Sequence, residues 1–205
     1  MITQDFFPAA NSDGSMWQGN DVFDTLVRLS SGYGASADTV NSSRSWHPVP
    51  YYIDRPYFNF DTSEIPSTAT IISATFYLYI DGIGWSGAYQ GLIQNTMANP
   101  ISYENADWGK IGDAAVGATE GASRFNCTTS GVWASWSFNA TGLTWVTKGG
   151  WTQLAIRCAQ DLDDAYVSDG GASFRMADYA DSNYWPKLTV QYDVPPSPFP
   201  THRIV

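Results

Sequence analysis

Positive charge is scarce in this sequence, and the scarcity excludes several classes of partner. Ten Lys and Arg stand against twenty Asp and Glu among 205 residues, which gives a formal net charge of −10. Nucleic acids and anionic membrane surfaces are bound by clustered cations, and the cations here are spread singly along the chain. We therefore expect no direct nucleic-acid binding.

Long apolar runs are also missing. No run approaches the roughly 20 residues that a membrane helix needs, so we expect no membrane insertion. The first residues, MITQDFFPAANSDG, show neither the basic region nor the apolar core of a signal peptide. We therefore expect a protein that carries no secretion signal in its sequence.

Cysteine is limited to Cys127 and Cys158, whose spacing fits no zinc or redox motif. Two alternatives stay open. A disulfide would close a loop of about 30 residues and add about 3 kcal/mol in the chain-entropy model. Otherwise the two residues are buried free thiols that pack as small hydrophobic side chains.

Catalytic motifs are absent as well. The sequence has only two histidines, His47 and His202, and no GxSxG, HExxH or glycine-rich phosphate loop. Among so many Asp and Glu residues, some pair will always resemble the two carboxylates of a glycosidase, so a pair alone predicts nothing. We expect no catalytic residues and a protein that is not an enzyme.

Aromatic residues, in contrast, are abundant at 15%, with nine Trp, and they fall in short strand-like runs. Gly, Asn, Asp and Ser clusters separate these runs, and a single short helical turn is expected within 139–148, capped by Asn139 or Thr141. The pattern predicts an all-β chain, an antiparallel β-sandwich of jelly-roll type, forming one domain over 1–193. The expected strands are 22–29, 56–60, 70–80, 88–94, 132–138, 151–159, 172–177 and 186–193.

The clearest part of this pattern is RPYFNFDTSEIPSTATIISATFYLYI, residues 55–80. Two β-rich runs flank a turn in which Asp61, Thr62 and Ser63 offer side-chain oxygens to the backbone. The strand residues expected in the core are Phe58, Phe60, Ile72 and Phe76.

The C-terminal segment VPPSPFPTHRIV, residues 194–205, differs from the rest because its prolines favour an extended polyproline geometry. It is either a solvated tail or an arm that lies on a neighbouring subunit. The arm would make contact through Pro195, Pro196, Pro198, Phe199, Ile204 and Val205.

Three segments of the chain resemble the DNRLRE-type β-jelly-roll domain, which is also classed among carbohydrate-binding modules. They are FDTSEIPSTATIISATFYLYI (60–80), FNATGLTWVTKGGWTQLAIR (138–157) and SFRMADYADSNYWPKLTVQYD (173–193). The name-giving hexapeptide is absent. The resemblance implies a jelly roll, and single-domain proteins of this kind occur among phage structural proteins.

Calcium is the one cofactor that the sequence suggests. Asp161, Asp163 and Asp164 cluster in the Gly-containing stretch AQDLDDAYVSDGG, and calcium prefers carboxylate oxygens. The spacing does not match an EF-hand loop, and a solvated acidic loop is the alternative.

Exposed aromatic rings are the candidate binding residues, because flat rings stack on sugars and anchor protein interfaces. We expect the rings in loop-like settings, which include Trp17, to be exposed, with Tyr33, Trp46, Trp85 and Trp108 as the binding candidates. Five other tryptophans, Trp133, Trp136, Trp145, Trp151 and Trp185, are expected in the core.

Two functions remain after these exclusions. The first is a non-enzymatic structural protein of a virion surface, either a capsid decoration or a tail protein. It would act through contacts with other virion proteins or with copies of itself. The alternative is an extracellular carbohydrate-binding or adhesive module.

Overall fold

The computed structural model describes residues 1–9, 11–32, 34–36, 40–46, 50–85, 89–112 and 117–196, and only the backbone of 24, 27, 34–36, 40–46 and 85. Strands predominate among the described residues and the helices are short, so the predicted all-β sandwich is confirmed. The strands are β1 (Ile2–Phe6), β2 (Asp13–Asn20), β3 (Gly34–Ser36), β4 (Val40–Trp46), β5 (Tyr51–Asp61), β6 (Thr70–Trp85), β7 (Tyr89–Gln94), β8 (Phe125–Asn126), β9 (Val132–Ser137), β10 (Trp151–Cys158), β11 (Gly170–Arg175) and β12 (Lys187–Asp193).

The helical elements are α1 (Phe23–Val27), α2 (Ala140–Trp145), α3 (Ala159–Asp163) and the 3-10 turns η1 (Asn105–Lys110) and η2 (Ser182–Tyr184). No helix in the described part of the chain is long and apolar enough to cross a bilayer.

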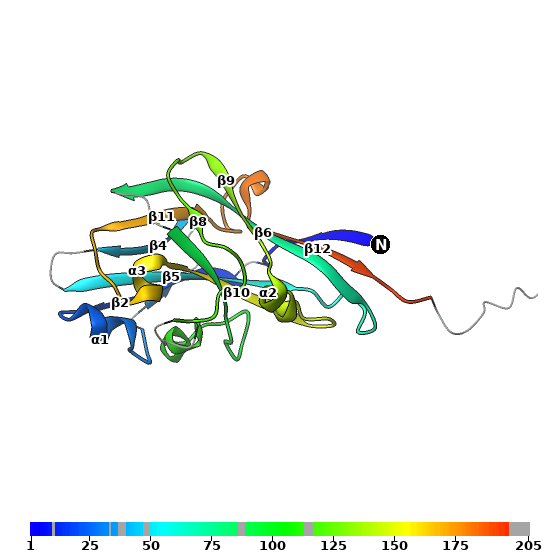
Figure 1. Cartoon of the computed structure of the whole chain (residues 1–205), viewed down its shortest axis with the longest axis horizontal. Coiled ribbons are helices and arrows are strands. Elements are labelled where there is room, and N and C mark those ends of the chain that lie inside the picture. The colour runs from blue at the N-terminus through cyan, green and yellow to red at the C-terminus, as the bar shows by residue number, and fades with distance from the viewer. Residues whose placement is uncertain are drawn as a thin grey trace, which may run out of the picture.

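All strand pairs are antiparallel, and the strands form two facing layers (Figure 1). One layer contains β1, β12, β6, β11 and β9, and the other contains β2, β5, β10, β7 and β8. Strand β4 pairs with β11 of the first layer and β5 of the second, which joins them. From β5 to β11 the chain alternates between the layers, apart from the two-residue β8, and this alternation is typical of a jelly roll.

The main core lies between the layers and follows from the two-residue period of the strands. Along β6 the even-numbered Phe76, Leu78 and Ile80 are buried, whereas the odd-numbered residues are only half-buried. Phe76 packs against Phe58 and Phe60 of the opposite layer, with ring centroids 5.1 and 5.7 Å apart.

A second core covers the outer face of the β5–β10–β7 layer. It contains Ile53 and Tyr57 of β5, Ile93 of β7, Leu26 of α1 and Leu162 of α3, all buried. The central part of this layer is therefore buried on both faces.

The predicted turn between β5 and β6 is confirmed in detail. The Ser63 N–H donates to Asp61 Oδ1 over 3.0 Å, and the Thr62 hydroxyl bonds to the backbone of Thr147 and Gly150. The predicted helical turn is α2, and Asn139 caps it by accepting from the Gly142 N–H.

Two sequence predictions are wrong. Residues 22–29 are not a strand: Phe23 and Leu26 lie one helical turn apart in α1, and both are buried in the second core. Ile72 is 42% exposed because the pairing register shifts at this point, between Gln191 and Tyr192, and Ile71 packs on the core instead.

Candidate functional site

A cluster of half-buried aromatic rings around the exposed Trp133 lies on the outer face of the β6 layer, and we refer to it as the aromatic face. Because Phe76, Leu78 and Ile80 point into the core, the residues between them on β6 point outward. The aromatic face comprises Tyr77, Tyr79, Trp133, Arg175, Tyr179 and Tyr184.

Trp133 is the most exposed ring of this face, with 41% of its surface accessible. It lies on β9 directly opposite Tyr79 of β6, and their ring centroids are 5.5 Å apart in an edge-on arrangement. Tyr79 also contacts Tyr184 at 4.4 Å. Cross-strand aromatic pairs of this kind are held by the sheet itself.

Arg175 organises the rest of the cluster. Its guanidinium carbon lies 4.6 Å from the Tyr79 ring centroid, 4.1 Å from that of Tyr179 and 4.4 Å from that of Tyr184. Its Nε donates to Asp81 Oδ1 over 2.8 Å. The cation–π contacts and the ion pair hold the rings in one arrangement before any ligand arrives.

The segment between β11 and β12 supplies two of the rings and is itself well ordered by hydrogen bonds. The Trp185 indole N–H donates to the Tyr179 carbonyl over 2.7 Å. Asp181 caps η2 by accepting from the Asn183 N–H. The rim of the aromatic face carries the exposed acids Asp178 and Asp181.

Chemically, this surface is suited to binding rather than to reaction. Trp, Tyr and Arg are the residues that dominate binding energy at protein interfaces. Rings that are already packed lose little conformational freedom when a partner docks.

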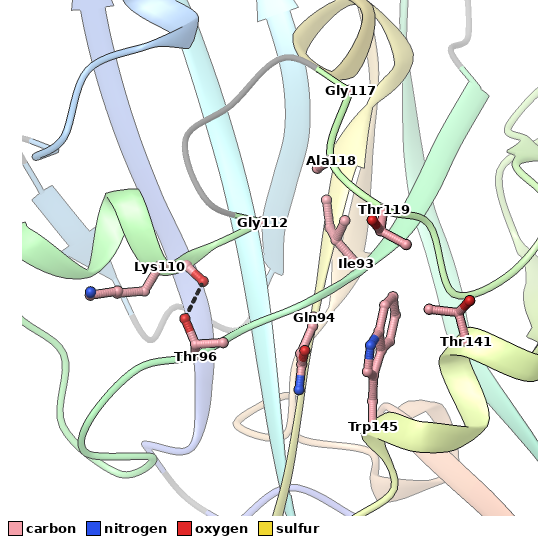
Figure 2. A pocket seen from close by; sticks show the side chains of 10 residues that line it. All are labelled: Ile93, Gln94, Thr96, Lys110, Gly112, Gly117, Ala118, Thr119, Thr141 and Trp145. Atoms are coloured by element: carbon pink, nitrogen blue, oxygen red, sulfur yellow. Dashed lines mark hydrogen bonds between the residues drawn. The ribbon is translucent and has the colours of Figure 1, made fainter.

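A separate hollow of about 390 Å³ lies between β7 and α2 (Figure 2). The Trp145 indole rises from α2 beside Gln94 of β7, and Thr141 lies on the same helix. Its polar and aromatic lining consists of Gln94, Thr96, Lys110, Thr119, Thr141 and Trp145. This volume falls in the range of small-ligand pockets.

Close packing fixes the wall of this hollow. A Cβ atom on Gly121 would lie 2.1 Å from the Trp145 ring, so the ring rests directly on the Gly121 backbone. Asn139 links α2 to the segment that contains Glu120 and Gly121. Its side chain caps α2 and also donates to the Glu120 carbonyl over 3.0 Å.

The predicted calcium ligands are held by arginines. Asp161 is fully buried and accepts from Arg55 and Arg157, both of which are buried as well. Burial alone would raise the pKa of Asp161, but the charges of Arg157 and Arg55 lower it to about 2. Asp163 pairs with Arg124 and Asp164 with Arg28.

Within the described ranges, no group of three or more His, Cys, Asp or Glu side chains could hold a metal ion. The predicted grouping of Asp161, Asp163 and Asp164 around calcium is therefore not found. The buried cluster of Arg55, Asp161 and Arg157 instead ties α3 to strands β5 and β10.

Trp108 is likewise not a surface ring. It is fully buried in the second core, with the Arg55 guanidinium 4.0 Å from its ring centroid. Trp108 was expected to be exposed because it lies in a polar loop, but this loop packs onto the outer face of a sheet. The prediction for Trp133 is also wrong: the sequence places it in the core, but the structure exposes it.

The other predicted rings are less fully described. Trp46 ends β4 opposite Tyr52, and Trp85 ends β6 opposite Gly170; only their backbones are described. Tyr33 lies outside the described residues.

In the arm, Pro195 and Pro196 are exposed. The remaining predicted contact residues, Pro198, Phe199, Ile204 and Val205, lie outside the described residues.

The sequence left open whether the two cysteines form a disulfide or are buried thiols, and the structure has buried thiols. Cys127 and Cys158 are both buried, and no disulfide joins them. Burial raises the pKa of Cys127 to about 12.

Sequence reasoning missed most of the aromatic face. The alternation in TFYLYI would have placed Tyr77 and Tyr79 outward once Phe76 was assigned to the core. The positions of Tyr179 and Tyr184 depend on the packing of the β11–β12 connection, which no local pattern predicts.

No protein-family model and no curated protein matches this chain.

Proposed function

We propose that this protein is a non-enzymatic structural protein of a virion surface, and that it acts through protein–protein contacts made by the aromatic face. The observation that carries the proposal is the pre-ordered cluster in which the exposed Trp133 packs beside the half-buried Tyr79, Tyr179, Tyr184 and Arg175. Interface hot spots have this composition, and truncating one costs about 2 kcal/mol or more of binding free energy.

The virion location is supported by the resemblance of 60–80, 138–157 and 173–193 to DNRLRE-type domains, which occur as single-domain phage structural proteins. The net charge of −10 agrees with a surface role, since a strongly charged exterior keeps repeated copies from non-specific association.

The test is incorporation into particles. Virions purified from the native source should contain the protein. A Trp133→Ala variant supplied in place of the wild type should be lost from them, with a drop of about 30-fold in apparent affinity for a hot-spot residue. Trp17→Ala is the matched control, because Trp17 is also 41% exposed but lies on β2 of the other layer. Equal incorporation of Trp133→Ala and wild type would contradict the proposal.

A carbohydrate-binding or adhesive role is the second candidate, and the hollow beside α2 is the observation that favours it. An indole edge with hydroxyl, amide and amine groups around it is suited to a sugar. Gln94→Ala should abolish hits on a glycan array without disturbing the fold, because its side chain is exposed. An array with no hits for the wild type would exclude this role for the glycans tested.

A further inference from the structure

We propose that the aromatic face of one copy binds the proline-rich arm, residues 194–205, of a second copy of this chain. This inference rests on the proposed function and names the partner that the aromatic face takes.

The chemistry of the arm complements the aromatic face. Its sequence VPPSPFPTHRIV has four prolines within seven residues. Prolines fix φ and favour a polyproline II helix, which has no internal hydrogen bonds and leaves its carbonyls free to accept. Such segments dock on surfaces lined with Tyr and Trp, where prolyl rings stack on the aromatic rings at low entropic cost.

The arm starts at the wrong end of the sheet to bind its own aromatic face. Strand β12 runs along β6 from Lys187, opposite Tyr77, to Asp193, opposite Thr70. Val194, the first residue of the arm, therefore follows the end of β12 beyond Thr70, and Tyr79 lies about 30 Å back along the strand. Figure 1 shows β12 ending at one end of the molecule, whereas strand β9 crosses its middle.

The length of the proline-rich stretch makes a return within one copy unfavourable. Residues 194–200 span about 22 Å in a polyproline II helix, and all twelve residues of the arm span about 37 Å when fully extended. Only an arm that first reversed direction and then stayed almost fully extended could reach back about 30 Å to Tyr79. A second copy placed beyond the end of β12 needs no such reversal.

Charge also favours this partner. The arm carries His202 and Arg203 and contains no Asp or Glu, in a chain with an overall charge of −10. The rim of the aromatic face carries the exposed acids Asp178 and Asp181. Two copies with a net charge of −10 repel one another, and this contact places a segment without Asp or Glu, carrying Arg203, against the acidic rim.

Each copy would then donate one arm and receive one. Two copies that exchange arms reciprocally would close a dimer, whereas copies that each pass the arm on in one direction would form rings or rows.

The experiment measures binding of a fluorescently labelled synthetic peptide, residues 193–205, by anisotropy. The titrated protein is the full chain with Pro195→Ser, Pro196→Ser and Pro198→Ser, whose own arm no longer competes. We expect saturable binding that Trp133→Ala weakens by at least about tenfold. Trp17→Ala should change it by less than about twofold, as a surface residue outside the contact.

Two further measurements exclude misfolding and non-specific binding. Tyr184→Ala is a second variant of the aromatic face and should also weaken binding, while circular dichroism checks that each variant is folded. A control peptide with every proline replaced by serine should bind at least about tenfold more weakly. In sedimentation, the wild-type chain should associate at concentrations where the triple-proline variant stays monomeric.

The inference and the proposed function can fail separately. Absence of saturable peptide binding, or binding that Trp133→Ala leaves unchanged, would overturn the arm contact. If Trp133→Ala is nevertheless lost from virions, the proposed function stands with another partner. If the peptide binds as expected but incorporation does not change, the arm contact stands and the proposed function fails.

Discussion

Replacing Asp13 with asparagine should stabilise this protein at neutral and alkaline pH. Asp13 begins β2 and is fully buried, and its Oδ2 accepts from the Ala177 N–H over 2.8 Å. No described group forms a hydrogen bond to its other oxygen, Oδ1. Burial raises its pKa to about 7, against the opposing effect of the Ala177 N–H and with a further contribution from the negative charge of Asp178.

The sign of the effect follows from proton binding. Between the unfolded pKa of 3.8 and the folded pKa of about 7, the folded state keeps the proton of Asp13 and the unfolded state has lost it. The free energy of unfolding therefore falls as pH rises, by about 1.4 kcal/mol per pH unit for this group. By pH 8 the ionisation of Asp13 has lowered the free energy of unfolding by at most about 4 kcal/mol.

Asparagine mimics the protonated acid, since its amide oxygen still accepts from the Ala177 N–H and it cannot ionise. Urea unfolding from pH 4.5 to 8.5 should show a wild-type stability that declines toward pH 8 and an Asp13→Asn stability that declines much less. Comparing the two removes the contribution of all other titrating groups.

Asp178→Asn serves as the second variant, because removing its negative charge should lower the pKa of Asp13 and shift the decline to lower pH. If wild type and Asp13→Asn differ by a constant amount across the whole pH range, the reasoning is refuted. Asp13 would then not change its ionisation on folding.

Three other predictions concern packing and charge. Asp161→Asn should destabilise the fold by about 3–5 kcal/mol in urea unfolding, because it removes the negative charge that two buried guanidiniums share. Asp163→Asn, on a half-exposed ion pair, should cost less than about 1 kcal/mol. Gly121→Ala should lower the melting temperature strongly through its clash with the Trp145 ring, costing about 1–3 kcal/mol or more. Gly149→Ala, where no atom lies within 4 Å and only the positive φ opposes a side chain, should cost about 1 kcal/mol. Both cysteines should resist a thiol reagent in the native protein and react on unfolding, and a reductant should leave the melting temperature unchanged; modification of the native protein would show that they are accessible.

The fold was predictable wherever one local rule decided the structure. Asp61 and Thr62 form their turn through their own side chains, and Asn139 caps α2 with its own carbonyl oxygen. Phe76 was assigned correctly to the core because the two-residue period of β6 is regular around it. Ile72 was not, since the register shift depends on the partner strand β12 and leaves no mark in the local pattern.

The candidate site was much less predictable, because exposure was inferred from loop-like sequence context. Trp108 lies in such a context, yet its loop covers the outer face of β5 and β10, where Arg55 meets it in the second core. Trp133 lies in a regular strand and is exposed because that layer has its core on one face only. Only one of the two layers has a hydrophobic core on both of its faces. Which layer this is depends on the tertiary packing, so a single sequence cannot reveal it.

This unequal covering also bears on how the protein could assemble. The central part of the β5–β10–β7 layer has a core on each of its faces, so rings buried there, such as Tyr57, contribute to stability and are not available to a partner. The outward side chains of β6, β9 and β12 are half-buried or exposed, and the same layer holds both Trp133 and the start of the arm at Asp193. Arm and aromatic face therefore lie about 30 Å apart along a single strand direction. A row of copies related by a shift along β6 would bring each arm onto the next aromatic face without distorting either sheet.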